Sequence, residues 1–108
     1  MKIYKFGGAS VKDANGVKNV AQIISKDAET SPILVVISAM GKSTNALEKI
    51  INAYYHENSD LNQLIEKFKS FHESIIKDLF QEDTPIWMNE VYNLMLELEC
   101  LLDNENLK

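Results

Sequence analysis

Two short runs of β-forming residues, KIYKF at residues 2–6 and ILVVI at residues 33–37, are separated by one stretch with helical spacing. Between residues 11 and 29 the apolar positions Val17, Val20, Ile23 and Ile24 fall on one stripe. A strand, a helix and a second strand form a βαβ unit, with parallel strands and a right-handed connection. The pattern predicts an α/β fold, and the unbroken run Ile33–Ile37 predicts a second strand covered on both faces.

The remainder of the chain has helical spacing only. Ser43 or Thr44 is expected to cap a helix, Asp60 with Gln63 resembles a capping pair for a long second helix, and Thr84-Pro85 suits the start of a third. The short connection QEDTP predicts that the last two helices form an antiparallel hairpin. The expected inward-facing residues are Leu47, Ile50, Ile51, Tyr54, then Leu61, Leu64, Ile65, Phe68, Ile75, Ile76, Leu79, then Val91, Leu94, Met95, Leu98, Leu101 and Leu102.

Two parallel strands leave both sheet edges open, and the helices carry more apolar surface than two strands can cover. We therefore expect residues 1–108 to be an incomplete domain, with a βαβα part at 1–58 and a helical hairpin at 59–108. The open edge and the uncovered helix faces predict self-association.

The charge balance excludes some classes of partner. The net charge is −5, and all 11 cationic residues are lysines, so no arginine is present. An acidic chain without a basic run argues against nucleic-acid or membrane binding, and no apolar run is long enough to span a membrane. The single cysteine, Cys100, lies in an apolar helical pattern and is interpreted as a small buried residue in the reducing cytoplasm.

The segment KFGGAS follows the first strand, at the strand end where open α/β sheets bind ligands. Gly7 and Gly8 would let the backbone approach a phosphate, while Lys5 and Ser10 would add an ammonium and a hydroxyl. A lysine that precedes the glycines does not match the Walker arrangement. The segment by itself is equally compatible with a simple tight turn.

A second loop of small and polar residues, SAMGKSTN, follows the second strand. In a βαβ unit both strands end at the same edge, so the two loops are expected to border one crevice. Each loop also has a purely structural interpretation, because Thr44 could serve only as a helix cap and Ser38 only as a satisfied hydroxyl.

The pair of segments KFGGAS-V and VVISAMGKSTNAL resembles the N-terminus of aspartate kinases, members of the amino-acid kinase family, mainly over residues 3–47. The resemblance includes the bifunctional forms fused to homoserine dehydrogenase. It implies the carbamate kinase-like three-layer α/β fold, with the helical remainder as an insertion of that family. Ala9 departs from the family pattern, which usually has threonine there.

The resemblance implies transfer of the γ-phosphoryl group of ATP, with Mg²⁺, to the side-chain carboxylate of L-aspartate, the first step of lysine, threonine and methionine biosynthesis. Lys5 would be catalytic and would contact the transferring phosphate. Gly7, Gly8 and Ser10 would bind the ATP phosphates, and Ser38 and Thr44 would bind aspartate. No residue of this chain is assigned to the metal. The family's substrate-binding glutamate and arginine and its metal-site acidic residues would follow residue 108, so the chain alone is expected to be inactive.

Two alternatives stay open. The first is a related kinase acting on glutamate or acetylglutamate, and the second is a helical interaction module that binds no nucleotide. Other side chains have structural interpretations: His56 as a solvated residue at a helix end, His72 at a packing boundary, and Trp87 and Met88 in the core.

Overall fold

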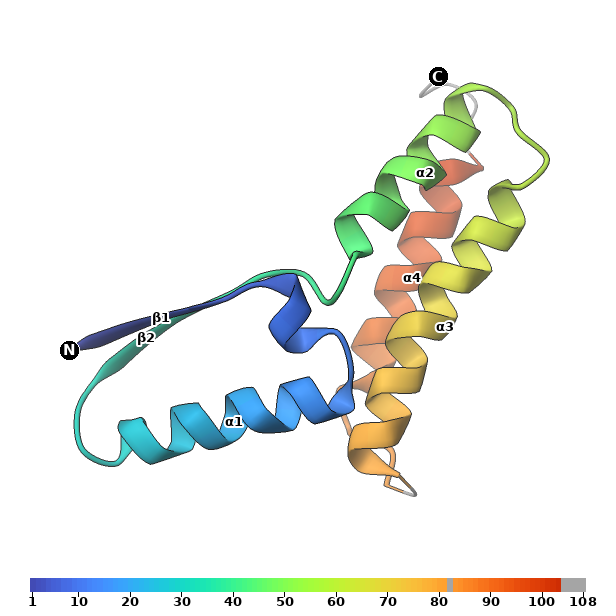
Figure 1. Cartoon of the computed structure of the whole chain (residues 1–108). Coiled ribbons are helices and arrows are strands. Elements are labelled where there is room, and N and C mark those ends of the chain that lie inside the picture. Colours follow the sequence, from blue (N-terminus) through green and yellow to red (C-terminus); the bar gives the residue numbers. More distant parts are fainter. Residues whose placement is uncertain (82, 104–108) are drawn as a thin grey trace. The chain divides into compact units, whose positions relative to one another are not determined.

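A computed structural model describes residues 1–81 and 83–103, which form two compact units, residues 1–44 and residues 45–108. The first unit contains strand β1 (Lys2–Phe6), the 3-10 helix η1 (Gly8–Val11), helix α1 (Ala14–Ala28) and strand β2 (Ile33–Ile37) (Figure 1). Helix α2 (Ser43–Tyr55) begins at the boundary, and helices α3 (Leu61–Phe80) and α4 (Met88–Leu102) complete the second unit. The mixed α/β fold is as predicted.

The two strands pair in parallel, with Lys2 opposite Ile33 and Phe6 opposite Ile37. Helix α1 lies along one face of the pair (Figure 1). Side chains alternate along a strand, so Tyr4 and Phe6, whose rings stack 5.8 Å apart, face α1 together with Val35. The helix contributes Val20 to the buried part of this layer, as its predicted stripe requires.

The opposite face of the sheet is open among the described residues. Ile3 is 65% exposed there, and Leu34 and Val36 are each 49% exposed. The prediction that Ile33–Ile37 is covered on both faces is therefore wrong for this chain. The run gives β2 two apolar faces, and within the first unit α1 covers one of them.

Helix α1 begins later than the sequence pattern indicates. The expected helix from residue 11 is divided into η1 and α1, because Asp13 has an extended backbone (φ −154°) and caps α1. The Asp13 carboxylate accepts a hydrogen bond from the Gly16 N–H at 2.8 Å. This bond satisfies one of the N–H groups that the first turn of a helix leaves without an intrahelical partner.

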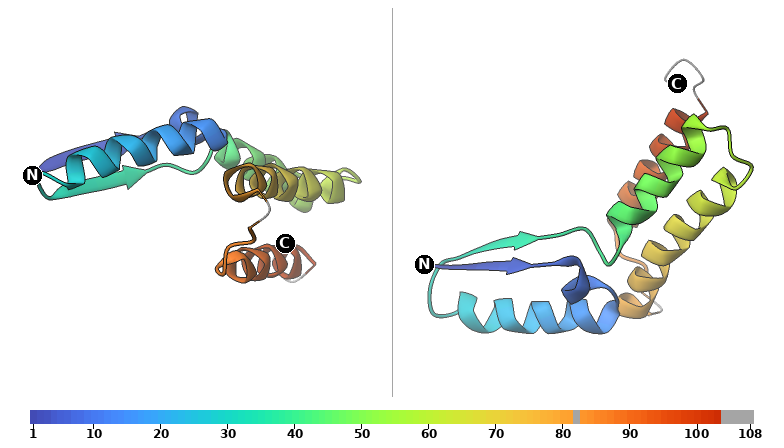
Figure 2. Two further views of the ribbon diagram at one scale, coloured as in Figure 1. Left: turned by 90° about the horizontal axis from the view of Figure 1, so that it is seen from below. Right: turned by 45° about the horizontal axis from the view of Figure 1, so that its top comes forward.

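In the second unit, α3 runs antiparallel to α2 and to α4 (Figure 2). The Lys69 ammonium of α3 and the Glu99 carboxylate of α4 form a hydrogen bond of 2.8 Å, so the predicted hairpin of the last two helices is confirmed. The core of this unit contains Ile50, Ala53, Tyr54, Ile65, Ile75 and Met88.

The predicted apolar stripe of α3 is confirmed, since all its residues are buried or half-buried. Those of α2 and α4 are partly wrong: Ile51 is 49% exposed, and Leu94 and Leu101 are 64% and 57% exposed. Cys100 is also exposed, not buried, because it lies on the face of α4 that points away from the packed residues. Apolar residues near Cys100 lie on several sides of α4, and the other helices cover only some of those sides.

The start of α4 also differs from the prediction. Thr84-Pro85 does not begin the helix; the Met88 N–H donates to the Pro85 carbonyl in a turn, and α4 starts at Met88. Trp87 is accordingly 43% exposed and stacks edge-on against Phe80, whereas Met88 is buried as expected. Asp60 is at the predicted N-cap of α3, but its side chain makes no capping bond.

The two histidines lie as predicted. His56 is exposed just after the end of α2, and half-buried His72 contacts the rings of Phe68 and Phe71, with its Nδ1 2.9 Å from the Phe68 carbonyl oxygen. No helix within residues 1–81 and 83–103 is long and apolar enough to cross a membrane.

Candidate functional site

The ends of the two strands lie side by side in the first unit. Beyond the last paired residues, the Ser38 N–H donates to the Phe6 carbonyl at 2.9 Å. The ladder of hydrogen bonds therefore continues to the point where both loops begin. The prediction that the two loops leave the sheet at one edge is confirmed.

The first loop turns immediately into η1. The Ser10 N–H donates to the Gly7 carbonyl at 3.0 Å, and the side chain of Val11 is buried, so the short helix is fixed at both ends. Ala9 and Ser10 are exposed between these points. A β-carbon placed on Gly7 would meet no atom within 4 Å, so the space beside this residue is open to a ligand.

Gly8 has the opposite surroundings. A β-carbon there would overlap the carbonyl oxygen of Gly41 and would lie 3.3 Å from that of Ala39. The Gly41 N–H also donates to the Gly8 carbonyl at 3.0 Å. The backbones of the two loops thus touch at Gly8 and Gly41, and only a residue without a side chain fits at position 8.

The second loop is fixed by backbone and hydroxyl bonds. Gly41 has a φ of 56°, in the left-handed region that favours glycine. The Met40 carbonyl accepts hydrogen bonds from both the N–H and the hydroxyl of Ser43, which is 4% exposed. Thr44 follows as an exposed residue in the first turn of α2. This arrangement leads the chain from strand to helix within five residues, Ser38 to Lys42.

The start of α1 is packed against the first loop. A β-carbon on Gly16 would lie 2.5 Å from the Ser10 carbonyl oxygen, so glycine at this position lets the helix approach the loop closely. Since the Gly16 N–H is also bonded to Asp13, the N-terminus of α1 is anchored directly beside Ser10. Helix N-termini favour negative charge, so the N-terminus of α1 adds a partial positive charge beside the first loop.

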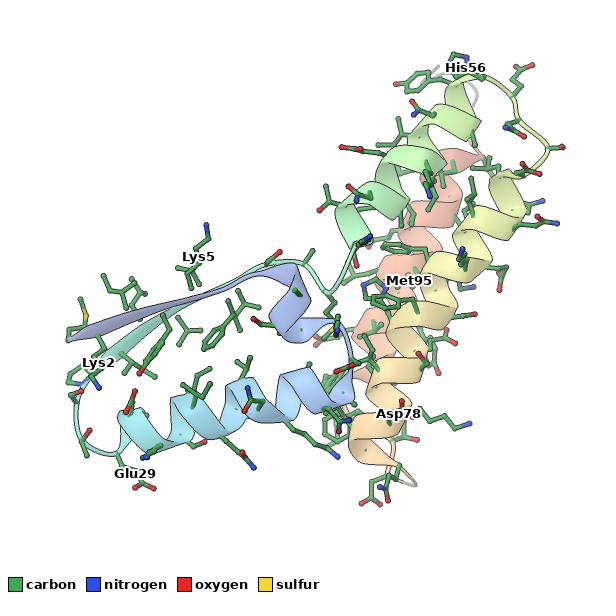
Figure 3. The ribbon with its side chains drawn as sticks, viewed as in Figure 1. Lys2, Lys5, Glu29, His56, Asp78 and Met95 are labelled. Carbon is green, nitrogen blue, oxygen red and sulfur yellow. The ribbon has the colours of Figure 1, made fainter. Side chains whose placement is uncertain are left out.

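Lys5 lies on the open face of the sheet, opposite Val36, and its side chain points away from α1 (Figure 3). Lys2, on the same strand, faces the other way, and its ammonium is 3.6 Å from the Asp27 carboxylate of α1. The two lysines of β1 therefore occupy different surroundings. Lys2 is paired within the fold, while exposed Lys5 is available to a ligand above the open face.

The structure thus places every residue proposed for the site in the first unit. Gly8 is joined to the second loop, and Gly7 and Ser10 are exposed in the first loop. The Ser38 N–H donates to the Phe6 carbonyl of β1, and the Ser38 hydroxyl donates to the Ala39 carbonyl at 3.1 Å. Thr44 lies three positions past Gly41. Sequence reasoning gave no role to Gly41, although a glycine between a strand and a helix is a signal of positive φ.

Among the described residues, no group of three or more His, Cys, Asp or Glu side chains could hold a metal ion. Of the acidic groups near the loops in sequence, Asp13 caps α1 and Asp27 pairs with Lys2, while Glu48 is exposed on α2. The charge-bearing groups that the two loops and β1 present to a ligand are lysines.

The sequence pattern that defines the amino acid kinase family matches residues 1–96, which include both loops and most of the helical unit. The chain belongs to the amino acid kinase family.

Several aspartokinases are similar to this amino acid kinase chain. Aspartokinase 1, chloroplastic, of Arabidopsis thaliana is 38% identical over 81 residues, covering 71% of the chain and 14% of that protein. The bifunctional aspartokinase/homoserine dehydrogenase of Buchnera aphidicola is 33% identical over 118 aligned positions, covering 93% of the chain and 14% of that protein. An aspartokinase of Chlamydia pneumoniae is 34% identical, covering 71% of the chain and 16% of that protein.

The chain therefore spans about a seventh of the length of these relatives. No solved structure gave a significant match to the chain.

Proposed function

We propose that this chain is an incomplete amino-acid kinase domain, and that it carries the phosphate-binding and substrate-binding loops of an aspartate kinase. The observation that carries the proposal is the contact of the two loops at Gly8 and Gly41, at the edge where a kinase of this family would join its two substrates. The similar proteins are named as aspartokinases, which favours aspartate over glutamate or acetylglutamate as the acceptor.

In this reaction an oxygen of the aspartate side-chain carboxylate attacks the γ-phosphorus of ATP. The bond from that phosphorus to the bridging oxygen breaks, ADP leaves, and 4-phospho-L-aspartate forms. A carboxylate needs no general base to become a nucleophile, so catalysis consists of positioning and charge neutralisation. The product would serve amino-acid biosynthesis.

Lys5 would neutralise negative charge on the transferring phosphoryl group, which its exposed position on the open face permits. The open space beside Gly7 would admit a phosphate oxygen close to the backbone, and the hydroxyl of Ser10 would donate to it. Ser38 and Thr44 would contact the aspartate.

Mg²⁺ would enter with ATP, because the phosphate oxygens are the hard ligands that this ion prefers. When bound, the ion would neutralise phosphate charge. The chain's own contribution is Lys5, the backbone of the first loop and the hydroxyls of both loops.

We also propose a cytoplasmic location, since the thiol of Cys100 is exposed and a free exposed thiol is best preserved in a reducing compartment.

The test is a titration of the chain with Mg·ATP, followed by the NMR shifts of the backbone amides. We expect shifts at Gly7, Gly8 and Ser10 in the wild type. Lys5→Met should weaken binding by roughly tenfold or more, as expected for loss of a charge-assisted contact. Lys2→Met is the matched control: it removes a lysine from the same strand but from the face that pairs with Asp27.

Equal weakening in both lysine variants would show only a general charge effect and would count against a role for Lys5. An absence of shifts in the wild type would favour the helical interaction module. The exposed leucines of α4, Leu94, Leu96 and Leu101, are the feature that supports that alternative.

A further inference from the structure

The two glycines of the first loop have different surroundings, and this difference suggests different tasks. Beside Gly7 the space is open to 4 Å, whereas a β-carbon on Gly8 would overlap the backbone of the second loop. We propose that Gly8 and Gly41 form a joint that sets the spacing between the first loop, which would bind phosphate, and the second loop, which would bind aspartate. This inference rests on the proposed function and assigns Gly41 as a positioning residue.

The contact at this joint is tight and involves backbone on both sides. The atoms that a side chain at position 8 would meet are the carbonyl oxygens of Gly41 and Ala39, which cannot rotate away as a flexible side chain could. The 3.0 Å hydrogen bond from the Gly41 N–H to the Gly8 carbonyl fixes the approach in a second direction. The joint therefore has little freedom to open without breaking a hydrogen bond.

Each partner of the joint is in turn held by its own element. Gly8 begins η1, which is anchored by buried Val11, and Gly41 lies inside the turn that the two Ser43–Met40 hydrogen bonds close at the start of α2. The positive φ of Gly41 turns its N–H toward the first loop. The two loops thus meet at Gly8 and Gly41, and the proposed ligand-binding residues Gly7, Ser10, Ser38 and Thr44 are exposed.

A phosphoryl group can transfer only when the acceptor oxygen is held in line and close to the γ-phosphorus. Misplacement by about 1 Å is enough to cost roughly 100-fold in rate. A fixed backbone contact between the loops that bind the two substrates would supply this positioning without touching either substrate. Gly41 therefore acts on the reaction through loop geometry, and Gly7 through direct approach to phosphate.

Two alanine variants of the 108-residue chain separate these tasks. Gly8→Ala should raise the hydrogen-exchange rate of the Gly41 amide by roughly tenfold or more, because the added methyl group must push the two loops apart. It should also abolish the shifts that Mg·ATP causes in the second loop, at Ser38, Gly41 and Thr44, while shifts at Ser10 persist. Gly7→Ala should leave the protection of Gly41 unchanged but weaken Mg·ATP binding.

A second pair of variants applies if Gly8→Ala loses the sheet, as judged from the amide shifts of Tyr4 and Val35. Gly41→Asn should keep the joint, because asparagine tolerates positive φ, whereas Gly41→Val should break it. Equal protection and equal second-loop shifts in these two variants would overturn the proposal. So would an unchanged Gly41 amide in a folded Gly8→Ala chain.

The results distinguish this inference from the proposed function. If Mg·ATP shifts no amide of the first loop in the wild type, the proposed function is wrong, and with it the catalytic meaning of the joint. If the first loop responds to Mg·ATP but the second loop responds equally in wild type and folded Gly8→Ala, the kinase proposal stands and the positioning role of Gly41 is wrong.

Discussion

The Lys69 ammonium on α3 lies 2.8 Å from the Glu99 carboxylate on α4, thirty residues further along the chain. Their side chains are 24% and 33% exposed, and Glu66 on the same helix as Lys69 lies 3.5 Å from the ammonium. The hydrogen bond to Glu99, with a smaller contribution from the charge of Glu66, raises the pKa of Lys69 above its ordinary value. This interaction links α3 to α4.

We predict that Glu99→Gln lowers the melting temperature of the chain at pH 7. A raised pKa in the folded state means that the stabilisation is complete below the ordinary pKa of lysine and is lost as the pH rises through the raised value. The difference in melting temperature between wild type and Glu99→Gln should therefore shrink above that pH, and at neutral pH it should shrink with added salt.

Glu97→Gln is the matched control, since it removes a carboxylate from an exposed position on the same helix. It should change the melting temperature much less than Glu99→Gln at neutral pH. If the difference in melting temperature between wild type and Glu99→Gln stayed constant from neutral pH to well above the lysine pKa, the stabilising role of the Lys69–Glu99 ion pair would be contradicted.

A second prediction compares two N-cap aspartates. Asp13 caps α1 with a 2.8 Å bond from the Gly16 N–H, whereas Asp60 is at the N-cap of α3 without a side-chain bond. Asp13→Ala should reduce the free energy of unfolding by about 1 kcal/mol, the usual value of a capping bond. Asp60→Ala should cost less than about 0.5 kcal/mol, as for an ordinary surface substitution.

Urea unfolding followed by the amide signals of each unit measures both values. A loss of similar size in the two variants would show that the Asp13 bond contributes no more than the charge of an aspartate near a helix N-terminus. Asp13→Asn should recover part of the stability, because the asparagine oxygen can still accept from the Gly16 N–H.

Local patterns in the sequence were sufficient to predict the two strands, their parallel pairing and the helix between them. The alternation in KIYKF and the spacing of Val17, Val20 and Ile24 depend only on the geometry of a strand and of a helix. The same patterns could not tell that Asp13 would cap α1 and divide the expected helix, because a cap depends on the backbone angles of one residue. The start of α4 was missed for a similar reason, since Thr84-Pro85 is a good helix start but here forms a preceding turn.

Burial was predicted less well than element type. Leu94, Leu101 and Cys100 lie in an apolar pattern, yet all three are exposed. A sequence shows which residues are apolar, but it does not show which face of a helix will pack against another element. The site followed the same rule: the strand order predicted that the two loops meet, whereas the contact of Gly8 with Gly41 depends on backbone positions that no residue pattern specifies.

The open face of the sheet leads to a third prediction, that the chain self-associates. Ile3, Leu34 and Val36 form an exposed apolar surface on β1 and β2, and each strand has an unpaired edge within the part of the chain that the structure describes. Burying this surface against a second copy would remove it from water, at roughly 25 cal/mol per Å² of apolar area. The weight-average mass in sedimentation equilibrium should therefore rise with concentration.

Leu34→Lys should shift this association to higher concentration, because it places a charge in the centre of the apolar surface. Thr30→Lys is the control, since it adds the same charge at an exposed turn residue before β2. A mass equal to that of the monomer at all concentrations would contradict the prediction, and equal effects of both variants would indicate simple charge repulsion.

The fourth prediction is that the 108-residue chain does not phosphorylate aspartate. Transfer between two anions requires several cationic groups placed around the reacting atoms. On β1 and its loop only Lys5 is available, since Lys2 is paired with Asp27, and the chain contains no arginine to hold the α-carboxylate of aspartate. The release of ADP from Mg·ATP should therefore be the same with and without L-aspartate, and the same in wild type and in Lys5→Met. ADP release that depends on L-aspartate in the wild type and disappears in Lys5→Met would show that the two loops suffice for catalysis, and the requirement for further cationic groups would then be wrong.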